Sequence, residues 1–122
     1  LHLIDKPINL GEVCVTPIPV KHGILDILGY RFNDFGYITD ASYISEESLN
    51  LLRGVKVLVI NALRERPHAT HFSLAQAREV AEKIAPQQTY FTHICHRLEH
   101  HETNRQLPPE FQLAYDGLEF TI

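Results

Sequence analysis

The stretch Val55-Lys56-Val57-Leu58-Val59-Ile60-Asn61-Ala62-Leu63 is a nearly unbroken apolar run, and it decides the fold class. Such a run, rich in β-branched residues, is typical of a strand buried on both faces. A capped helix is predicted on each side of it. Ser45 precedes a helix over residues 46–53, and Ser73 begins a second helix with Gln76 at the N3 position of a capping box. Helix and strand therefore alternate, which indicates an α/β (α+β) arrangement.

Further strands are predicted on the N-terminal side of this unit. Residues 11–20 alternate apolar with small or polar residues, which predicts a strand that is broken at its two prolines. Residues 29–33 and 35–39 predict two short strands, and Asn33-Asp34 between them predicts a tight hairpin turn.

The C-terminal side is expected to add more strands and a short helix. Residues 89–94 predict a strand and residues 97–104 a short helix. Residues 111–115 and 118–122 predict a closing hairpin, because Asp116-Gly117 is a type I′ turn signal. We therefore expect a mixed sheet with helices on one face.

The composition is that of a soluble globular protein, and 122 residues fit a single domain over residues 1–122. The net charge of −4 argues against a nucleic-acid groove that depends on positive potential. No apolar run reaches the length of a membrane span, so no membrane partner is expected. The two cysteines, Cys14 and Cys95, lie apart in apolar runs, which suits a reducing compartment and predicts a cytoplasmic protein.

Three polar residues lie at the ends of predicted strands and are candidate metal ligands. His22 and Asp40 follow apolar runs, and His93 lies in the strand over residues 89–94. Imidazole and carboxylate are ligands that Zn²⁺ and Mn²⁺ accept, and strand ends hold ligands in fixed positions. Each residue alone is also typical of a turn or core position. The three together favour one metal site.

Three further histidines are candidates for catalysis and substrate contact. His68 and His71 lie in a polar loop before the helix that begins at Ser73, where the helix dipole lowers a histidine pKa. His71, next to the cap, is the predicted general acid or base, and a solvated loop histidine is the alternative. His68 and His96 are predicted to contact substrate.

Six short motifs resemble those of the metallo-β-lactamase-fold hydrolases, in order and spacing. The similarity is greatest to the branch that contains the phosphoribosyl cyclic phosphodiesterase of phosphonate metabolism and enzymes of the ribonuclease-Z type. The motifs are residues 20–23 (VKHG), 28–32 (LGYRF), 37–41 (YITDA), 67–74 (PHATHFSL), 92–96 (THICH) and 114–117 (AYDG).

This resemblance implies a role for each matched residue. His22 would bind the first metal, Asp40 would bridge two metals, His93 would bind the second metal, and His71 would assist departure of the leaving group. Two Zn²⁺ or Mn²⁺ ions would activate a hydroxide for attack on a phosphoester of a small molecule.

One family signature, His-x-His-x-Asp-His, is absent from these residues. It supplies most metal ligands and lies in the N-terminal half of the αββα sandwich. The chain therefore resembles the C-terminal half only, and we expect a fragment of a hydrolase that is inactive alone and binds metal poorly or not at all. The half-sandwich leaves an apolar sheet face bare, which predicts a homo-oligomer.

Two alternatives remain at the level of the sequence. The first is a non-catalytic binding or interaction domain that keeps the fold, which the missing signature supports. The second is a thiol enzyme that uses Cys95 with His93 or His96. It is weaker, because Cys95 has no evident partner that would stabilise a thiolate.

Overall fold

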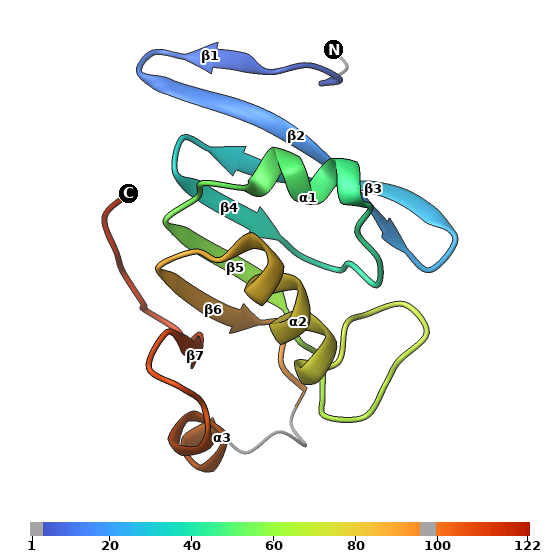
Figure 1. Ribbon diagram of the computed structural model, residues 1–122, viewed down its shortest axis with the longest axis vertical. Coiled ribbons are helices and arrows are strands. Elements are labelled where there is room, and N and C mark those ends of the chain that lie inside the picture. The colour runs from blue at the N-terminus through green and yellow to red at the C-terminus, as the bar shows by residue number, and fades with distance from the viewer. Residues whose placement is uncertain (1–3, 96–99) are drawn as a thin grey trace.

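The computed structural model describes residues 4–95 and 100–122 of the chain. Its elements are β1 (Ile8–Leu10), β2 (Val13–His22), β3 (Leu25–Phe32), β4 (Phe35–Ile38), α1 (Glu46–Leu52), β5 (Val57–Asn61), α2 (Leu74–Ile84), β6 (Gln88–Thr92), α3 (His100–Gln106) and β7 (Phe111–Leu113). Within these residues the strands form a 7-stranded sheet in sequence order, from β1 to β7 (Figure 1). Neighbours are antiparallel from β1 to β4 and parallel from β4 to β7, so the sheet is mixed, as predicted.

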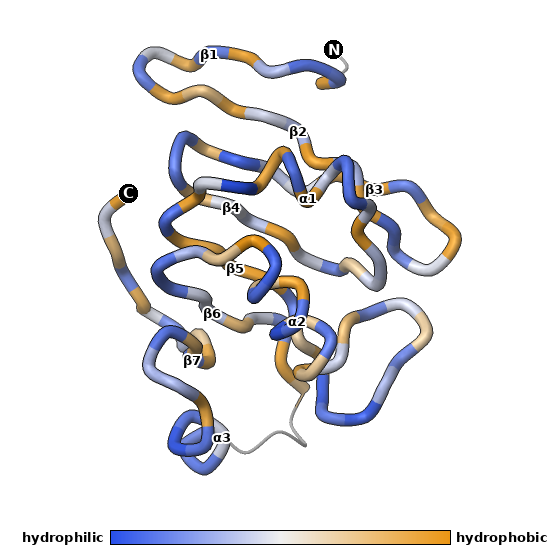
Figure 2. The backbone as a smooth tube through the Cα atoms, viewed as in Figure 1, coloured by the Kyte–Doolittle hydropathy of each residue, from blue (hydrophilic) through white to orange (hydrophobic). Residues whose placement is uncertain are grey.

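Helices α1 and α2 lie over one face of the sheet, and α3 lies beside β7 (Figure 1). The prediction of helices on one face is therefore confirmed. The interior strand β5 consists mainly of hydrophobic residues, whereas α3 is mostly hydrophilic (Figure 2). No described helix combines the length and the apolar character that crossing a bilayer requires. The core under the helices includes the fully buried Ile18, Ile38, Leu52, Leu58 and Ile60.

Both predicted helix starts are confirmed by their hydrogen bonds. The Ser48 N–H donates to Ser45 Oγ over 3.2 Å at the start of α1. At α2 the capping box is complete, because the Gln76 N–H donates to Ser73 Oγ and the Ser73 N–H donates to Gln76 Oε1. These bonds satisfy amides that a helix start leaves without an internal partner.

The predicted break in the second strand is wrong, because β2 runs through Pro17 and Pro19 without interruption. The Lys21 N–H donates to Tyr43 O rather than to β3, so alternate residues of β2 direct their nitrogens away from β3. Pro17 and Pro19 share this alternation with Lys21. A proline that lacks an N–H therefore costs no hydrogen bond to β3.

The predicted C-terminal hairpin is also wrong. Residues 118–122 form no strand, and β7 pairs in parallel with β6. A type I′ turn needs two residues with positive φ, but at this turn only Gly117 has one, at +86°. Phe120 instead packs on the rings of Phe35 and Tyr90, with centroids 5.4 Å away in each case.

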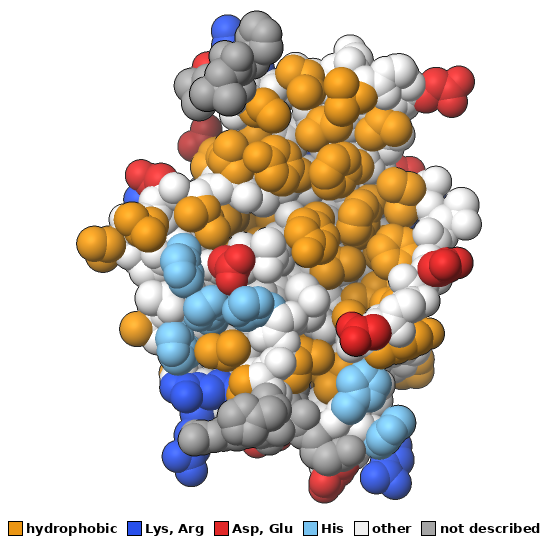
Figure 3. Space-filling view, turned by 180° about the vertical axis from the view of Figure 1, so that it is seen from behind, with side chains coloured by type: hydrophobic (Ala, Val, Ile, Leu, Met, Phe, Trp, Pro, Cys, Tyr) orange, Lys and Arg blue, Asp and Glu red, His pale blue; other side chains and the backbone are white. Residues whose placement is uncertain are grey.

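In the described residues, the sheet face opposite the helices is apolar and open. Figure 3 shows hydrophobic side chains gathered over this face. Aromatic rings from neighbouring strands and from the C-terminal tail are in contact on it: Phe32, Phe35, Tyr37, Tyr90 and Phe120.

Candidate metal centre

Three polar residues meet at one edge of the sheet because strands β4, β5 and β6 are parallel. Asp40 follows the end of β4, His93 follows the end of β6, and His71 lies in the loop between β5 and α2. Asp40 and His93 have positive φ values of 60° and 58°. Such values are uncommon outside glycine, and they often mark functional sites.

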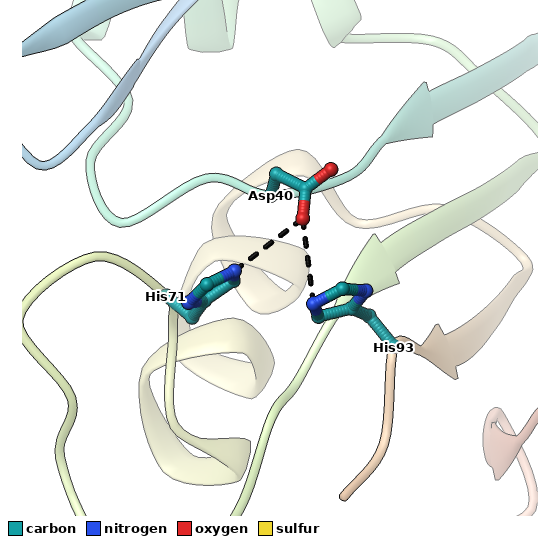
Figure 4. Close-up of side chains that lie close together, drawn as sticks. All are labelled: Asp40, His71 and His93. Carbon is teal, nitrogen blue, oxygen red and sulfur yellow. Dashed lines mark hydrogen bonds and ion pairs between the residues drawn. The ribbon is translucent and has the colours of Figure 1, made fainter.

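The side chains of Asp40, His71 and His93 point toward one another (Figure 4). Asp40 Oδ1 lies 3.3 Å from His71 Nε2 and 3.4 Å from His93 Nε2. One ligand atom from each residue lies within 4.8 Å of the other two. The donor set of two imidazole nitrogens and one carboxylate oxygen fits a divalent cation such as Zn²⁺ or Mn²⁺.

His22, at the end of β2, lies beside this group. Its ring is 4.8 Å from the His71 ring, between centroids, and its Nδ1 is 2.9 Å from the Thr70 carbonyl oxygen. A carbonyl oxygen can only accept, so the proton of neutral His22 is on Nδ1 and the lone pair is on Nε2. A backbone carbonyl commonly sets the tautomer of a metal-binding histidine in this way.

The loop that carries His71 is held by hydrogen bonds among its own residues. The Thr70 N–H donates to His68 Nδ1 over 3.2 Å, and Thr70 Oγ1 lies 3.0 Å from His71 Nδ1. His68 therefore lies next to the site, with its ring centroid 5.2 Å from that of His71. His96, the other predicted substrate contact, lies outside the described residues.

Burial lowers the pKa of His71 below its ordinary value of 6.5. A hydrogen bond to Asp40 opposes this shift, and the nearby His93 and His22 add to it. The lowered pKa favours neutral His71 at neutral pH. A neutral imidazole is the form that binds a metal or accepts a proton.

A surface pocket of about 260 Å³ adjoins the site through His93. It lies between the ends of β6 and β7. Its lining residues are Thr92, His93, Ile94, Ala114, Tyr115 and Asp116.

The structure brings together His22, Asp40, His71 and His93, all of which were predicted from the sequence. It places His71, predicted as a catalytic residue, with Asp40 and His93 in the group that could hold a cation. Two residues that bond to this group or to its backbone, Thr70 and Asn61, were not predicted from the sequence. The signal for Asn61 was present, because it is the polar residue in the middle of the apolar run Val57–Leu63.

A family model described as the β-lactamase superfamily domain matches residues 2–94. Among curated proteins, the chain is 32% identical over 120 residues to an octanoyltransferase of Porphyromonas gingivalis (strain ATCC BAA-308 / W83), covering 97% of this chain and 24% of that protein. The chain thus spans about a quarter of this curated relative.

Solved structures show the same fold. A diphosphatase from the PhnP family superposes with a TM-score of 0.93 at 47% identity, over 97% of this chain and 46% of that one. YhfI from Bacillus subtilis, a metallo-β-lactamase fold protein, gives 0.79 at 18% identity, over 96% of this chain and 53% of that one. The short form of human tRNase Z superposes with a TM-score of 0.68 at 15% identity, over 91% of this chain and 42% of that one. The chain spans about half the length of these proteins.

Proposed function

Because this chain belongs to the β-lactamase superfamily and has the metallo-β-lactamase fold, we propose that it supplies some of the ligands of the metal centre of a phosphoester or diphosphate hydrolase. The diphosphatase that is 47% identical to it supports a phosphorus-containing small-molecule substrate. The remaining ligands would come from an N-terminal part of a longer polypeptide, since the chain covers 46% of that diphosphatase. Alone, the chain would be inactive.

The convergence of Asp40, His71 and His93 from three separate segments carries this proposal. Asp40 would be shared by two divalent cations, His93 would bind one of them, and His22 would bind the other through Nε2. When bound, the cations supply a hydroxide at neutral pH and screen the phosphate charge. The ions would be Zn²⁺ or Mn²⁺, which accept this donor set.

His71 is proposed to give the leaving group a proton from Nε2 while the ring carries protons on both nitrogens, so that a neutral imidazole remains. Its Nε2 faces the carboxylate oxygen of Asp40 at 3.3 Å, and a carboxylate only accepts, so the proton of neutral His71 is on Nε2. The Thr70 hydroxyl can then donate to Nδ1, which keeps the ring in this orientation. His68, next to this ring, and His96 are proposed to contact the substrate.

The test is hydrolysis by the full gene product that contains this chain, with Mn²⁺ or Zn²⁺ added, on a cyclic phosphodiester and on a diphosphate. We expect Asp40→Ala to reduce turnover more than about 100-fold, because it removes a metal ligand and loss of a residue that only orients a ligand already costs up to that much. Asp26→Ala is the matched control, since Asp26 is an exposed carboxylate on β3. Undiminished turnover in Asp40→Ala would contradict the proposal.

The open apolar face favours a second candidate function, that of an interaction domain without catalysis. In the hydrolase proposed above, the N-terminal part of the longer polypeptide would instead cover this face, and two copies would pair through it when the chain is produced alone. Light scattering then shows a concentration-dependent dimer of the isolated chain and none of the longer product. A metal-free, inactive gene product would favour the interaction domain.

A nucleic-acid substrate is not part of this proposal, because the net charge of −4 opposes binding to a polyanion. We also propose a cytoplasmic location. Cys14 and Cys95 are both unpaired, and this suits a reducing compartment.

A further inference from the structure

Asn61 is a buried polar residue directly beneath the candidate metal centre. It ends β5, and its side chain is 0% exposed. Its Oδ1 accepts from the Ala41 N–H over 2.9 Å, and its Nδ2 donates to the Ala41 carbonyl over 2.8 Å. One side chain thus binds both backbone groups of the residue that follows Asp40, as a neighbouring strand would.

These two bonds hold the backbone next to Asp40, which has an unfavourable conformation. Asp40 has a φ of 60°, in the left-handed region that costs energy for a residue with a side chain. β4 ends at Ile38, so β4–β5 ladder bonds no longer hold the chain at Asp40 and Ala41. There the side-chain amide of Asn61 binds the Ala41 backbone instead.

Backbone hydrogen bonds of Ala41 and Ala62 also connect to the segments that carry the histidines. The Ala41 carbonyl accepts a second hydrogen bond, over 2.8 Å, from the N–H of Phe72. Phe72 is the residue that follows His71. The next residue after Asn61, Ala62, donates its N–H to the Thr92 carbonyl over 2.9 Å, directly before His93. Hydrogen bonds at Ala41, Asn61 and Ala62 therefore link the three segments that carry Asp40, His71 and His93.

We propose that Asn61 is a positioning residue that holds Asp40 between His71 and His93 and thereby sets the affinity of the site for a divalent cation. This inference rests on the proposed function. A buried amide without its partners is costly, so both bonds to Ala41 persist in the folded chain. Replacing Asn61 by an apolar residue of similar size removes the bonds and frees the Asp40–Ala41 segment.

The test compares Asn61→Leu with Val59→Ala in the full gene product. Val59 lies on the same strand and sheet face, and its side chain has no hydrogen-bonding group, so its variant controls for lost stability. Titration calorimetry with Mn²⁺ alone measures affinity. We expect Asn61→Leu to weaken binding about 10- to 100-fold, as loss of a residue that orients a metal ligand does, and Val59→Ala to change it less than about threefold.

Amide hydrogen exchange of Ala41 gives a readout that needs no metal. We expect slow exchange in the wild type and in Val59→Ala, and exchange at least about 10-fold faster in Asn61→Leu, since the acceptor of the Ala41 N–H is lost. Fast exchange in the wild type, or equal affinity of the two variants, would overturn the inference.

A wild type that binds neither Mn²⁺ nor Zn²⁺ would refute the proposed function. In that case the exchange of Ala41 still decides whether Asn61 holds this segment. If Asn61→Leu does not fold, exchange in the wild type and in Val59→Ala decides it.

Discussion

Gly29 lies on β3 opposite Ile38, and replacing it with alanine should destabilise the fold by a predictable route. A Cβ at position 29 would lie 2.4 Å from Ile38 Cδ1 and 2.9 Å from the Tyr37 carbonyl oxygen. Normal contacts begin near 3.4 Å. The isoleucine tip can rotate away, whereas the carbonyl is part of β4 and can move only with the strand that leads to Asp40.

The magnitude follows from these two contacts. Overpacking a buried site costs about 1–3 kcal/mol. The loss of glycine flexibility in the unfolded chain offsets about 0.5–1 kcal/mol of this. Taking the middle of each range, we expect Gly29→Ala to lower the free energy of unfolding by about 1 kcal/mol.

The assay is a double-mutant cycle by urea denaturation. Ile38→Val removes the Cδ1 atom and alone costs about 0.5–1.5 kcal/mol. In the double variant the contact with Cδ1 is absent, so the two losses should sum to more than the measured total, with a coupling of at least about 0.5 kcal/mol. The clash with the Tyr37 carbonyl remains, so rescue should be incomplete. This steric reasoning would be refuted if Gly29→Ala left the free energy of unfolding unchanged, or if the losses of the two single variants simply added in the double variant.

Three other changes should follow from the structure. Ser73→Ala removes the N-cap of α2 and should cost about 1 kcal/mol in urea denaturation, and a loss below about 0.3 kcal/mol would show that the capping box contributes little. Burial lowers the pKa of His71 in the folded state, so in EDTA the stability from this group is complete above its ordinary pKa of 6.5 and is lost as pH falls through the lower folded pKa. Between pH 7 and 5 the urea midpoint should therefore fall less steeply in His71→Gln than in the wild type. An equal slope in the two proteins would contradict a lowered pKa of His71 in the folded state. Phe120→Ala exposes the rings of Phe35 and Tyr90 and should cost about 1 kcal/mol, and unchanged urea midpoints would show that the tail does not stabilise the sheet.

Local signals in the sequence identified most elements of the fold. The apolar run around Leu58 predicted the central strand, and Ser45 and Ser73 marked both helix starts on the covered face. Errors arose where pairing partners decide the outcome. Pro17 and Pro19 lie within a continuous strand because their nitrogens point away from β3, and this alternation is a property of the sheet rather than of the residues.

The histidines and Asp40 could be selected from the sequence because each stands at or near the end of a strand or helix pattern. Their arrangement could not, because it depends on distances between segments far apart in the chain. The contact between Asp40 and His71 joins residues 31 positions apart, and the bonds from Asn61 to Ala41 span 20.

Taken alone, the order of residues determined the type of each main element and the chemical groups available at the strand ends, because hydrophobic period and helix caps act over a few neighbouring residues. Only the folded sheet decided that Asp40, His71 and His93 share one point and that the amide of Asn61 supports it. Parallel pairing of β4, β5 and β6 brings their ends to the same edge, and no local signal contains that distance.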